Sequence, residues 1–458
     1  MMHFQQQPFR KPELLKEAND MKFYDREDKI AKLHAIREES ERDSRFTVIT
    51  GKRRVGKTEL VKRAFSDESF AYLFVSRKSE SDLVEGFVDE FNRVFPSSIS
   101  REIRSLEGFF GEVFKFARHK HVTVFVDEFQ EFEKVNPAFF SVLQGLWDRE
   151  HANARINLVV CGSINSLMNR IFLNRKEPLY GHQTSFMRID PFPIAVLKDI
   201  LSHHKKNWEP EDLLALWTLT GGVAKYVALL MDEGATSAGK MFAAVISEDS
   251  FFLEEGRVLL GDEFGKGYSV YFSILSAIAR GLTSRNEIEL AVGRQIGGHL
   301  TRLEEDYHLI SKTTPFAAKT SRLMRYQISD PFYRFWFRFI FRYDYMVQMK
   351  SFALLRKIVV RDYPVFSGHA LEDYFRIKLA ESGKWTRIGS WWDRKGENEI
   401  DIIAENELNG TMLVAEVKRY ANRISICRLQ EKFDAFRRTV GIKPADNASF
   451  AALSMDDM

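Results

Sequence analysis

The sequence predicts an α/β protein with two α/β units and a helical region between them. Four short apolar runs typical of buried β-strands occupy the first half, separated by helical stretches as in a parallel sheet: 46–50, 71–76, 122–129 and 156–163. Helical spacing of apolar residues continues from about 195 to 250, and a second α/β pattern begins near residue 365. With 458 residues, the chain is long enough for two or three domains.

Composition narrows the class of protein. The net charge of +3, from 67 basic and 64 acidic residues, does not mark the whole chain as a nucleic-acid binder. Cys161 and Cys427 are far apart in the sequence, so we expect no disulfide and a reducing compartment. No apolar run approaches the roughly 20 residues of a membrane-spanning helix, and residues 1–13 lack the apolar core of a signal peptide. We therefore expect a cytoplasmic protein without a membrane partner.

A phosphate-binding motif follows the first predicted strand directly. Residues 51–58 read GKRRVGKT, the complete Walker A pattern, between a strand and a helix. Lys57 is expected to neutralise the β- and γ-phosphates of a nucleotide, and the Thr58 hydroxyl to bind Mg²⁺. A plain glycine turn is the alternative, but the strand before it and the helix after it favour an ATP-binding P-loop. The residues predicted to contact the cofactor here are Gly51, Arg54, Val55, Gly56, Lys57, Thr58 and Glu59.

The run VTVFVDEF (122–129) supplies a second part of such a site. Its strand ends in Asp127, predicted to hold the Mg²⁺, and Glu128, predicted to be the general base for an attacking water. A third strand, INLVVCGS, ends in Ser163. A glutamate directly after the aspartate favours an enzyme that hydrolyses ATP over a protein that only changes conformation when it binds nucleotide.

These motifs together resemble the archaeal-type ATPase family, a STAND-like branch of the AAA superfamily found in archaea and bacteria. In that family a polar residue at the position of Ser163 senses the γ-phosphate, and an ordinary strand-end serine is the alternative. The family also implies a winged helix, an aromatic segment beginning DPF and a nuclease-like C-terminal domain. The matching segments are Arg26-Glu27, GKRRVGKT, VDEFQEF, CGSINSLM, PLYGHQT (178–184), GGVAKY (221–226) and DPFYRFWFRFIF (330–341).

Two departures from the family pattern bear on the rate of hydrolysis. His182 stands where the family has an arginine that could act on the γ-phosphate, so we expect slow turnover. Arg175 and Arg188 lie nearby in the sequence and could compensate. Ala224 replaces a proline at a position where related ATPases sense the state of the nucleotide.

The C-terminal segment carries a second group of charged residues. Glu372 lies on a predicted helix, and Asp401 lies on a predicted strand at the end of segment 391–405. Glu416 and Lys418 lie two apart on the next strand, so they project from one face. This order resembles the PD-(D/E)xK nuclease core, a restriction-endonuclease-like fold. It implies that Glu372, Asp401 and Glu416 bind Mg²⁺ or Mn²⁺ and that Lys418 is catalytic. An amphipathic hairpin with a surface ion pair is the alternative.

We divide the chain into an N-terminal extension (1–22), a P-loop ATPase core (23–194), a helical lid (195–262), a winged helix (263–329), an aromatic linker (330–364) and a nuclease-like domain (365–458). The third helix of the winged helix would present some of Gln295, His299 and Arg302 to DNA. The acidic residues 304–306 follow directly and disfavour a phosphate-binding face. Contact with DNA and packing against protein therefore both stay open for this module. Two functions remain: an ATPase coupled to a nuclease-like domain that acts on nucleic acid, with DNA favoured over RNA, and a STAND-type regulatory ATPase whose C-terminal domain binds without cleaving. A homo-oligomer is compatible with both.

Overall fold

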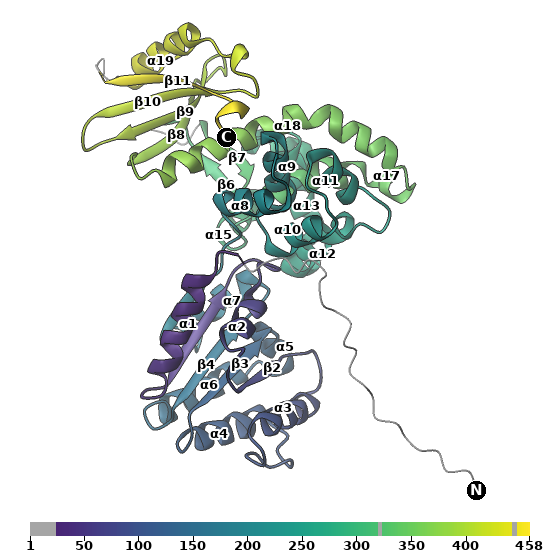
Figure 1. Ribbon diagram of the computed structural model, residues 1–458, viewed down its shortest axis with the longest axis vertical. Helices are drawn as coiled ribbons and strands as arrows, with labels where there is room; N and C mark the ends of the chain where they lie inside the picture. Colours follow the sequence, from purple (N-terminus) through teal and green to yellow (C-terminus); the bar gives the residue numbers. More distant parts are fainter. Residues whose placement is uncertain (1–23, 319–322, 442–446) are drawn as a thin grey trace.

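The computed structural model describes residues 24–318, 323–441 and 447–458. The expected N-terminal extension, residues 1–22, lies outside the described residues. Figure 1 shows one sheet unit at one end of the molecule, a second sheet near the other end, and helices between them. Within the described ranges, no helix combines the length and the apolar character needed to cross a bilayer.

The first sheet has five parallel strands in the order β2-β3-β4-β1-β5. Its strands are β1 (Arg45–Thr50), β2 (Phe70–Phe74), β3 (Val122–Asp127), β4 (Ile156–Cys161) and β5 (Ser185–Arg188). The expected parallel α/β fold is therefore confirmed, with β5 as an additional short edge strand. Because all strands run in one direction, their carboxyl ends meet at one edge of the sheet. The residues that directly follow β1, β3 and β4 therefore lie at this edge; they are Gly51, Glu128 and Gly162.

Helices cover both faces of this sheet. They are α1 (Glu27–Glu39), α2 (Lys57–Ala64), α3 (Glu80–Val94), α4 (Leu106–Ala117), α5 (Phe132–Val135), α6 (Phe139–Glu150) and α7 (Asn165–Leu173). Alternate residues of β1 enter two separate cores: Phe46 and Val48 pack with α3, α4 and α6, whereas Ile49 packs with α1 and α2. Burial on both faces accounts for the apolar residues Phe46, Val48 and Ile49 of this strand, in which Thr47 and Thr50 are also buried.

A helical region follows the first sheet. It contains α8 (Ile194–His204), α9 (Pro210–Thr220), α10 (Ala224–Asp232), α11 (Ala238–Val245) and α12 (Phe251–Phe264). The next elements are α13 (Tyr268–Ala279), α14 (Arg285–Val292), α15 (Gly297–Glu305), β6 (Ile310–Thr313) and β7 (Arg325–Ile328). Strands β6 and β7 pair antiparallel. Three helices followed by a small hairpin is the order expected of a winged helix, and that assignment stays a prediction.

The aromatic segment belongs to the largest core of the protein. Helix α16 (Pro331–Phe335) continues into a π-helical turn (Trp336–Ile340), followed by α17 (Asp344–Gln348) and α18 (Phe352–Glu381). Helix α18 runs without a break across the predicted boundary between residues 364 and 365, and the division of the chain into domains stays a prediction. Pro364 lies inside this helix. Tyr363 and Ser367, on either side, are buried, so tertiary packing outweighs the helix-breaking tendency of the proline.

The C-terminal unit begins with α18 and continues as β8 (Arg387–Trp392), β9 (Glu399–Asn406), β10 (Thr411–Val417), α19 (Ile426–Val440) and β11 (Ala448–Leu453). The sheet order is β11-β10-β9-β8. Strands β8, β9 and β10 pair antiparallel, and β11 runs parallel to β10. Helix α19 packs on the face of this sheet that carries Ile403 and Val414.

Candidate nucleotide site and C-terminal carboxylate site

The P-loop joins the end of β1 to the start of α2. Gly51 has φ 143°, and a Cβ atom at this position would lie 2.2 Å from the carbonyl oxygen of Ile189, so only glycine fits. The Lys57 ammonium group donates hydrogen bonds to the carbonyl oxygens of Gly51 and Lys52, both at 2.9 Å. Burial lowers the pKa of Lys57, although the charges of Asp127 and Glu128 oppose this effect. An anionic phosphate beside this buried ammonium would stabilise its charged form.

Asp127 is held by donors on both of its oxygens. Thr58 Oγ1 and Tyr72 Oη donate to Oδ2 at 2.8 and 3.1 Å. Cys161 Sγ and the backbone N–H of Glu128 donate to Oδ1, both at 2.9 Å. The predicted pair of Thr58 and Asp127 is therefore brought together, and its hydroxyl and carboxylate oxygens suit Mg²⁺. Sequence reasoning missed Cys161, whose position at the carboxyl end of β4 is the signal that could have found it, and Tyr72, which lies in the middle of β2 and carries no such signal.

Glu128 lies at the same edge, in a backbone conformation rare for residues other than glycine, with φ 56°. Its Oε2 atom accepts hydrogen bonds from Ser163 Oγ and Gln130 Nε2, both at 2.6 Å. The structure thus brings Ser163 into direct contact with the predicted general base. A group that binds Ser163 in place of Glu128 would free this carboxylate, which links the two predicted roles.

Three other predicted cofactor residues have side chains that face elsewhere. The Arg54 guanidinium pairs with buried Glu255 of α12, with Nε 2.5 Å from Oε1, and lies over the ring of Phe251 at 4.4 Å. Val55 is buried in the core formed with α1 and α2. Glu59 is exposed on α2 and lines a surface hollow. Backbone N–H groups are the part of Arg54 and Val55 that could reach a phosphate.

Arg188, rather than His182, borders the space beside the P-loop. His182 Nε2 lies 3.2 Å from Asp148 Oδ1 on α6. A cavity of about 230 Å³ separates the P-loop from the later helices, and its lining includes Gly51, Lys52, Ser163, Arg188, Glu263 and Asp330. Arg188 forms an ion pair with Asp190 at 2.8 Å. Of the two arginines considered as replacements for the family arginine, Arg188 therefore has the position that suits the role.

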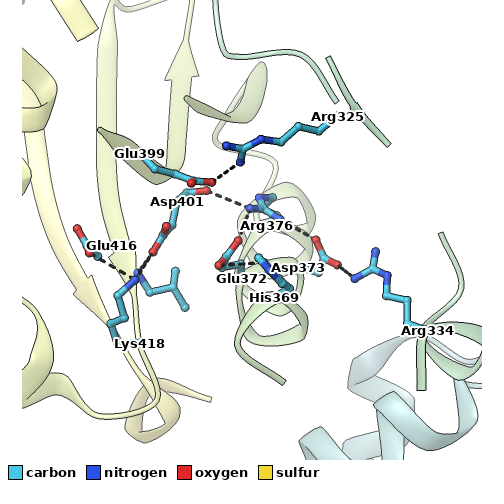
Figure 2. A network of polar contacts seen from close by, with 11 residues as sticks. Arg325, Arg334, His369, Glu372, Asp373, Arg376, Glu399, Asp401, Glu416 and Lys418 are labelled. Carbon is cyan, nitrogen blue, oxygen red and sulfur yellow. Dashed lines mark hydrogen bonds and ion pairs between the residues drawn. The ribbon is translucent and has the colours of Figure 1, made fainter. Parts of the chain in front are cut away.

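At the C-terminal site, Lys418 lies between two carboxylates (Figure 2). Its Nζ atom is 3.1 Å from Asp401 Oδ2 and 3.4 Å from Glu416 Oε1. Asp401 Oδ2 also accepts a hydrogen bond from the backbone N–H of Val417 at 2.8 Å, and Glu416 Oε2 accepts one from Lys432 at 2.8 Å. The strands β9 and β10 thus bring Asp401, Glu416 and Lys418 together on one side of the sheet.

Glu372 reaches the same region from α18. It contacts Arg376 NH2 at 2.9 Å and His369 Nδ1 at 3.5 Å, and Arg376 NH2 also donates to the carbonyl oxygen of Asp401 at 3.2 Å. Burial and the negative charge of Glu372 raise the pKa of Asp401 to about 6. Burial would raise the pKa of Glu372 as well, but His369 and Arg376 hold it below its usual value.

The donor set at this site suits a cation bound by few protein ligands. Within the described residues, no group of three or more His, Cys, Asp and Glu side chains is arranged to hold a metal ion. Asp401 and Glu416 supply two hard carboxylate ligands, and Mg²⁺ is commonly bound by one or two carboxylates while it keeps several waters. Glu372 as a third ligand stays a prediction.

The fold and the first site define a P-loop ATPase domain followed by helices and a separate C-terminal sheet unit. Residues 23–230 match the family described as an ATPase domain predominantly from Archaea. Residues 336–428 match a family of archaeal and bacterial proteins of unknown function. The first half of the chain is therefore similar to ATPase domains of the archaeal type.

The chain is also similar to two individual relatives and to a solved structure. The chain is 29% identical over 408 residues to an uncharacterized protein of Methanocaldococcus jannaschii, which covers 86% of this chain and 87% of the relative. A second uncharacterized protein of that organism is 28% identical over 88 residues, covering 18% of this chain and 85% of the relative. Among solved structures, the Walker-type ATPase of Pyrococcus abyssi matches with a TM-score of 0.54 and 18% identity, covering 71% of this chain and 99% of the other. This last likeness supports the fold.

Proposed function

We propose that the protein binds ATP with Mg²⁺ and hydrolyses it slowly. The hydrogen bond of 2.8 Å between Thr58 Oγ1 and Asp127 Oδ2 carries this proposal, because it joins the two predicted oxygen ligands of the cation. Lys57 would turn from the carbonyl oxygens of Gly51 and Lys52 toward the phosphates. Bound Mg²⁺ supplies charge neutralisation at the phosphates.

Glu128 would act as general base in this reaction. In the structure its carboxylate is engaged by Ser163 and Gln130. Contact between Ser163 and the γ-phosphate would release Glu128 to accept a proton from the attacking water. His182, which stands where the family has an arginine, is paired with Asp148. Turnover is slow because the γ-phosphate then lacks the positive charge of that arginine.

Lys57→Ala tests nucleotide binding directly. We expect this variant to lose tight binding of a fluorescent ATP analogue, because it removes the ammonium group that the Walker A motif places at the phosphates. Lys115→Ala, a matched change of an exposed lysine on α4, should bind as the unmodified protein does. Equal affinity in both variants would refute the P-loop assignment.

A second function, metal-dependent cleavage of nucleic acid, is favoured by the convergence of Asp401, Glu416 and Lys418. The surrounding element order, α18-β8-β9-β10-α19-β11 with one parallel pair, agrees with the PD-(D/E)xK resemblance of the sequence. Asp401 and Glu416 would hold Mg²⁺ or Mn²⁺, which supplies Lewis-acid chemistry at a scissile phosphate. Lys418 would place its positive charge beside that phosphate. We favour DNA over RNA as the substrate.

Purified protein with DNA or RNA, Mg²⁺ or Mn²⁺, and with or without ATP provides the test. Asp401→Ala and Glu416→Ala should each abolish cleavage and leave ATP binding unchanged, whereas Asp434→Ala, at an exposed ion pair on α19, should leave both unchanged. Nucleotide-dependent binding of nucleic acid without cleavage would instead support the STAND-type regulatory ATPase. Light scattering with and without ATP would reveal the homo-oligomer that both functions allow.

A further inference from the structure

The short helix α16 touches both sites. Asp330, the residue that caps its N-terminus, forms an ion pair with Lys52 of the P-loop. Arg334, one turn later, forms an ion pair with Asp373 of α18, beside Glu372. We propose that α16 couples the nucleotide state of the P-loop to the position of Glu372 and Arg376 at the C-terminal carboxylate site. This inference rests on the proposed binding of ATP.

The first step of the coupling lies within the P-loop. Lys52 is connected to the phosphate site through its backbone, because its carbonyl oxygen accepts a hydrogen bond of 2.9 Å from Lys57 Nζ. It is connected to α16 through its side chain, whose Nζ lies 2.7 Å from Asp330 Oδ2. When phosphates attract Lys57, the Lys52 carbonyl loses its donor. The loop segment that carries the ion pair to Asp330 is then free to shift.

The second step is the rigidity of α16. Asp330 Oδ1 accepts a hydrogen bond of 2.8 Å from the backbone N–H of Phe332, and the Asp330 carbonyl oxygen accepts one of 3.0 Å from the N–H of Arg334. Phe332 and Phe335 are buried in the large core, and the π-helical turn continues directly from the helix. A displacement of Asp330 therefore moves Arg334 with it, since both residues belong to one hydrogen-bonded turn.

The third step is a competition for Arg376, which Figure 2 shows between two acids. Arg334 NH1 donates to Asp373 Oδ2 at 2.7 Å, and Arg376 NH1 donates to Asp373 Oδ1 at 2.6 Å. Arg376 NH2 binds Glu372 Oε2 at 2.9 Å and the Asp401 carbonyl oxygen at 3.2 Å. Withdrawal of Arg334 leaves Asp373 with Arg376 as its remaining cation in this network. Arg376 then shifts toward Asp373 and releases Glu372 toward Asp401.

Partial burial strengthens the ion pairs that α16 forms with the P-loop and with α18. The side chains of Asp330, Arg334 and Asp373 are 5%, 18% and 21% exposed, so solvent screens them less than surface pairs. Coupling between two sites changes affinity by about 5- to 150-fold in proteins where it has been measured, and the effect is reciprocal. A change at Asp373 should therefore alter nucleotide affinity, although Asp373 belongs to α18 and not to the ATPase domain.

Amide hydrogen exchange measures the forward direction in the full-length protein. Addition of the non-hydrolysable analogue adenylyl imidodiphosphate with Mg²⁺ should change exchange in residues 368–381 and 399–406, at α18 and β9. Asp330→Asn should abolish this response, because asparagine retains the helix cap but lacks the charge that holds Lys52. Asp262→Asn, which neutralises the partner of Arg53 on α12, should retain the response.

Nucleotide titration measures the reverse direction. Asp373→Asn should change the affinity for the same analogue by about fivefold or more. Asp362→Asn, the same substitution at an exposed pair on α18, should leave the affinity unchanged. If the analogue binds but exchange at α18 does not respond, or if Asp373→Asn and Asp362→Asn bind alike, the coupling is refuted and the ATPase proposal stands. If the unmodified protein does not bind the analogue, both are refuted.

Discussion

Asp401 should make the C-terminal unit less stable as the pH rises through about 6. Burial and the neighbouring charge of Glu372 raise the pKa of its carboxyl group to about 6 in the folded protein, above the ordinary value of 3.8. Between these two values the folded chain binds more protons than the unfolded chain. The free energy of unfolding therefore decreases with rising pH in this window.

The magnitude follows from the two pKa values. Linkage gives a loss of about 1.4 kcal/mol between pH 5 and pH 7.5 and little change above that. Asp401→Asn removes the titrating group. The difference in unfolding free energy between this variant and the unmodified protein should therefore shift by about 1.4 kcal/mol in favour of the variant over the same interval. Any constant effect of the altered contact with Lys418 cancels in this comparison of two pH values.

Amide exchange of β9 and β10 at the two pH values provides the assay, because it reports local opening in a chain of several units. Asp393→Asn is a matched control on the β8–β9 turn, where hydrogen bonds to Asn398 and neighbouring backbone N–H groups hold the pKa of that carboxyl below its usual value, against the effect of burial. It should show no shift in favour of the variant over this interval. If Asp401→Asn and Asp393→Asn respond alike to pH, Asp401 does not carry the raised pKa. The charge arrangement at the C-terminal site would then need another explanation.

Three further predictions concern catalysis. Glu128→Gln should retain ATP binding but lower phosphate release by about 10²- to 10⁴-fold, because the amide cannot accept a proton; undiminished release would exclude Glu128 as the base. His182→Arg should raise turnover by about tenfold or more in a steady-state ATPase assay, and a decrease would indicate that another residue, with Arg188 the first to test, already fills the role. Lys418→Ala should lower the rate of nucleic-acid cleavage by about 10²-fold while Mn²⁺ affinity is retained; equal loss of both would make Lys418 part of the metal-binding arrangement.

The sequence predicted the first sheet well because its strands are buried on both faces. Largely apolar runs such as 122–127 are clear strand signals when a Walker A motif shows where a strand ends and a helix begins. The edge strand β5 has only four residues and is partly exposed, so its pattern is weak. The course of α18 through Pro364 could not be predicted, because the packing that tolerates the proline comes from α9 and α11, more than one hundred residues away.

The candidate site residues show the same difference between local signals, which the sequence carries, and contacts between distant segments, which it does not. Local spacing was enough to place Glu416 and Lys418 on one face. Thr58 and Asp127 could be paired across 69 positions because each belongs to a recognisable motif of a P-loop site. Tyr72 was missed because the partner of its hydroxyl group lies 55 positions away, on a neighbouring strand. Arg376 was missed because a helical arginine has many exposed roles, and its contact with the Asp401 carbonyl oxygen depends on where α18 meets β9.

The three variable basic residues of the Walker A loop show why side-chain roles in this motif are hard to infer from sequence. Each forms an ion pair with an acid that lies more than 200 positions later: Lys52 with Asp330, Arg53 with Asp262 and Arg54 with Glu255. A loop that binds phosphate through its backbone N–H groups leaves its side chains free for other contacts. Here those contacts join the loop to α12 and α16, so any movement of the loop on nucleotide binding acts on both helices. The phosphate site and its connection to the rest of the protein therefore occupy the same eight-residue motif.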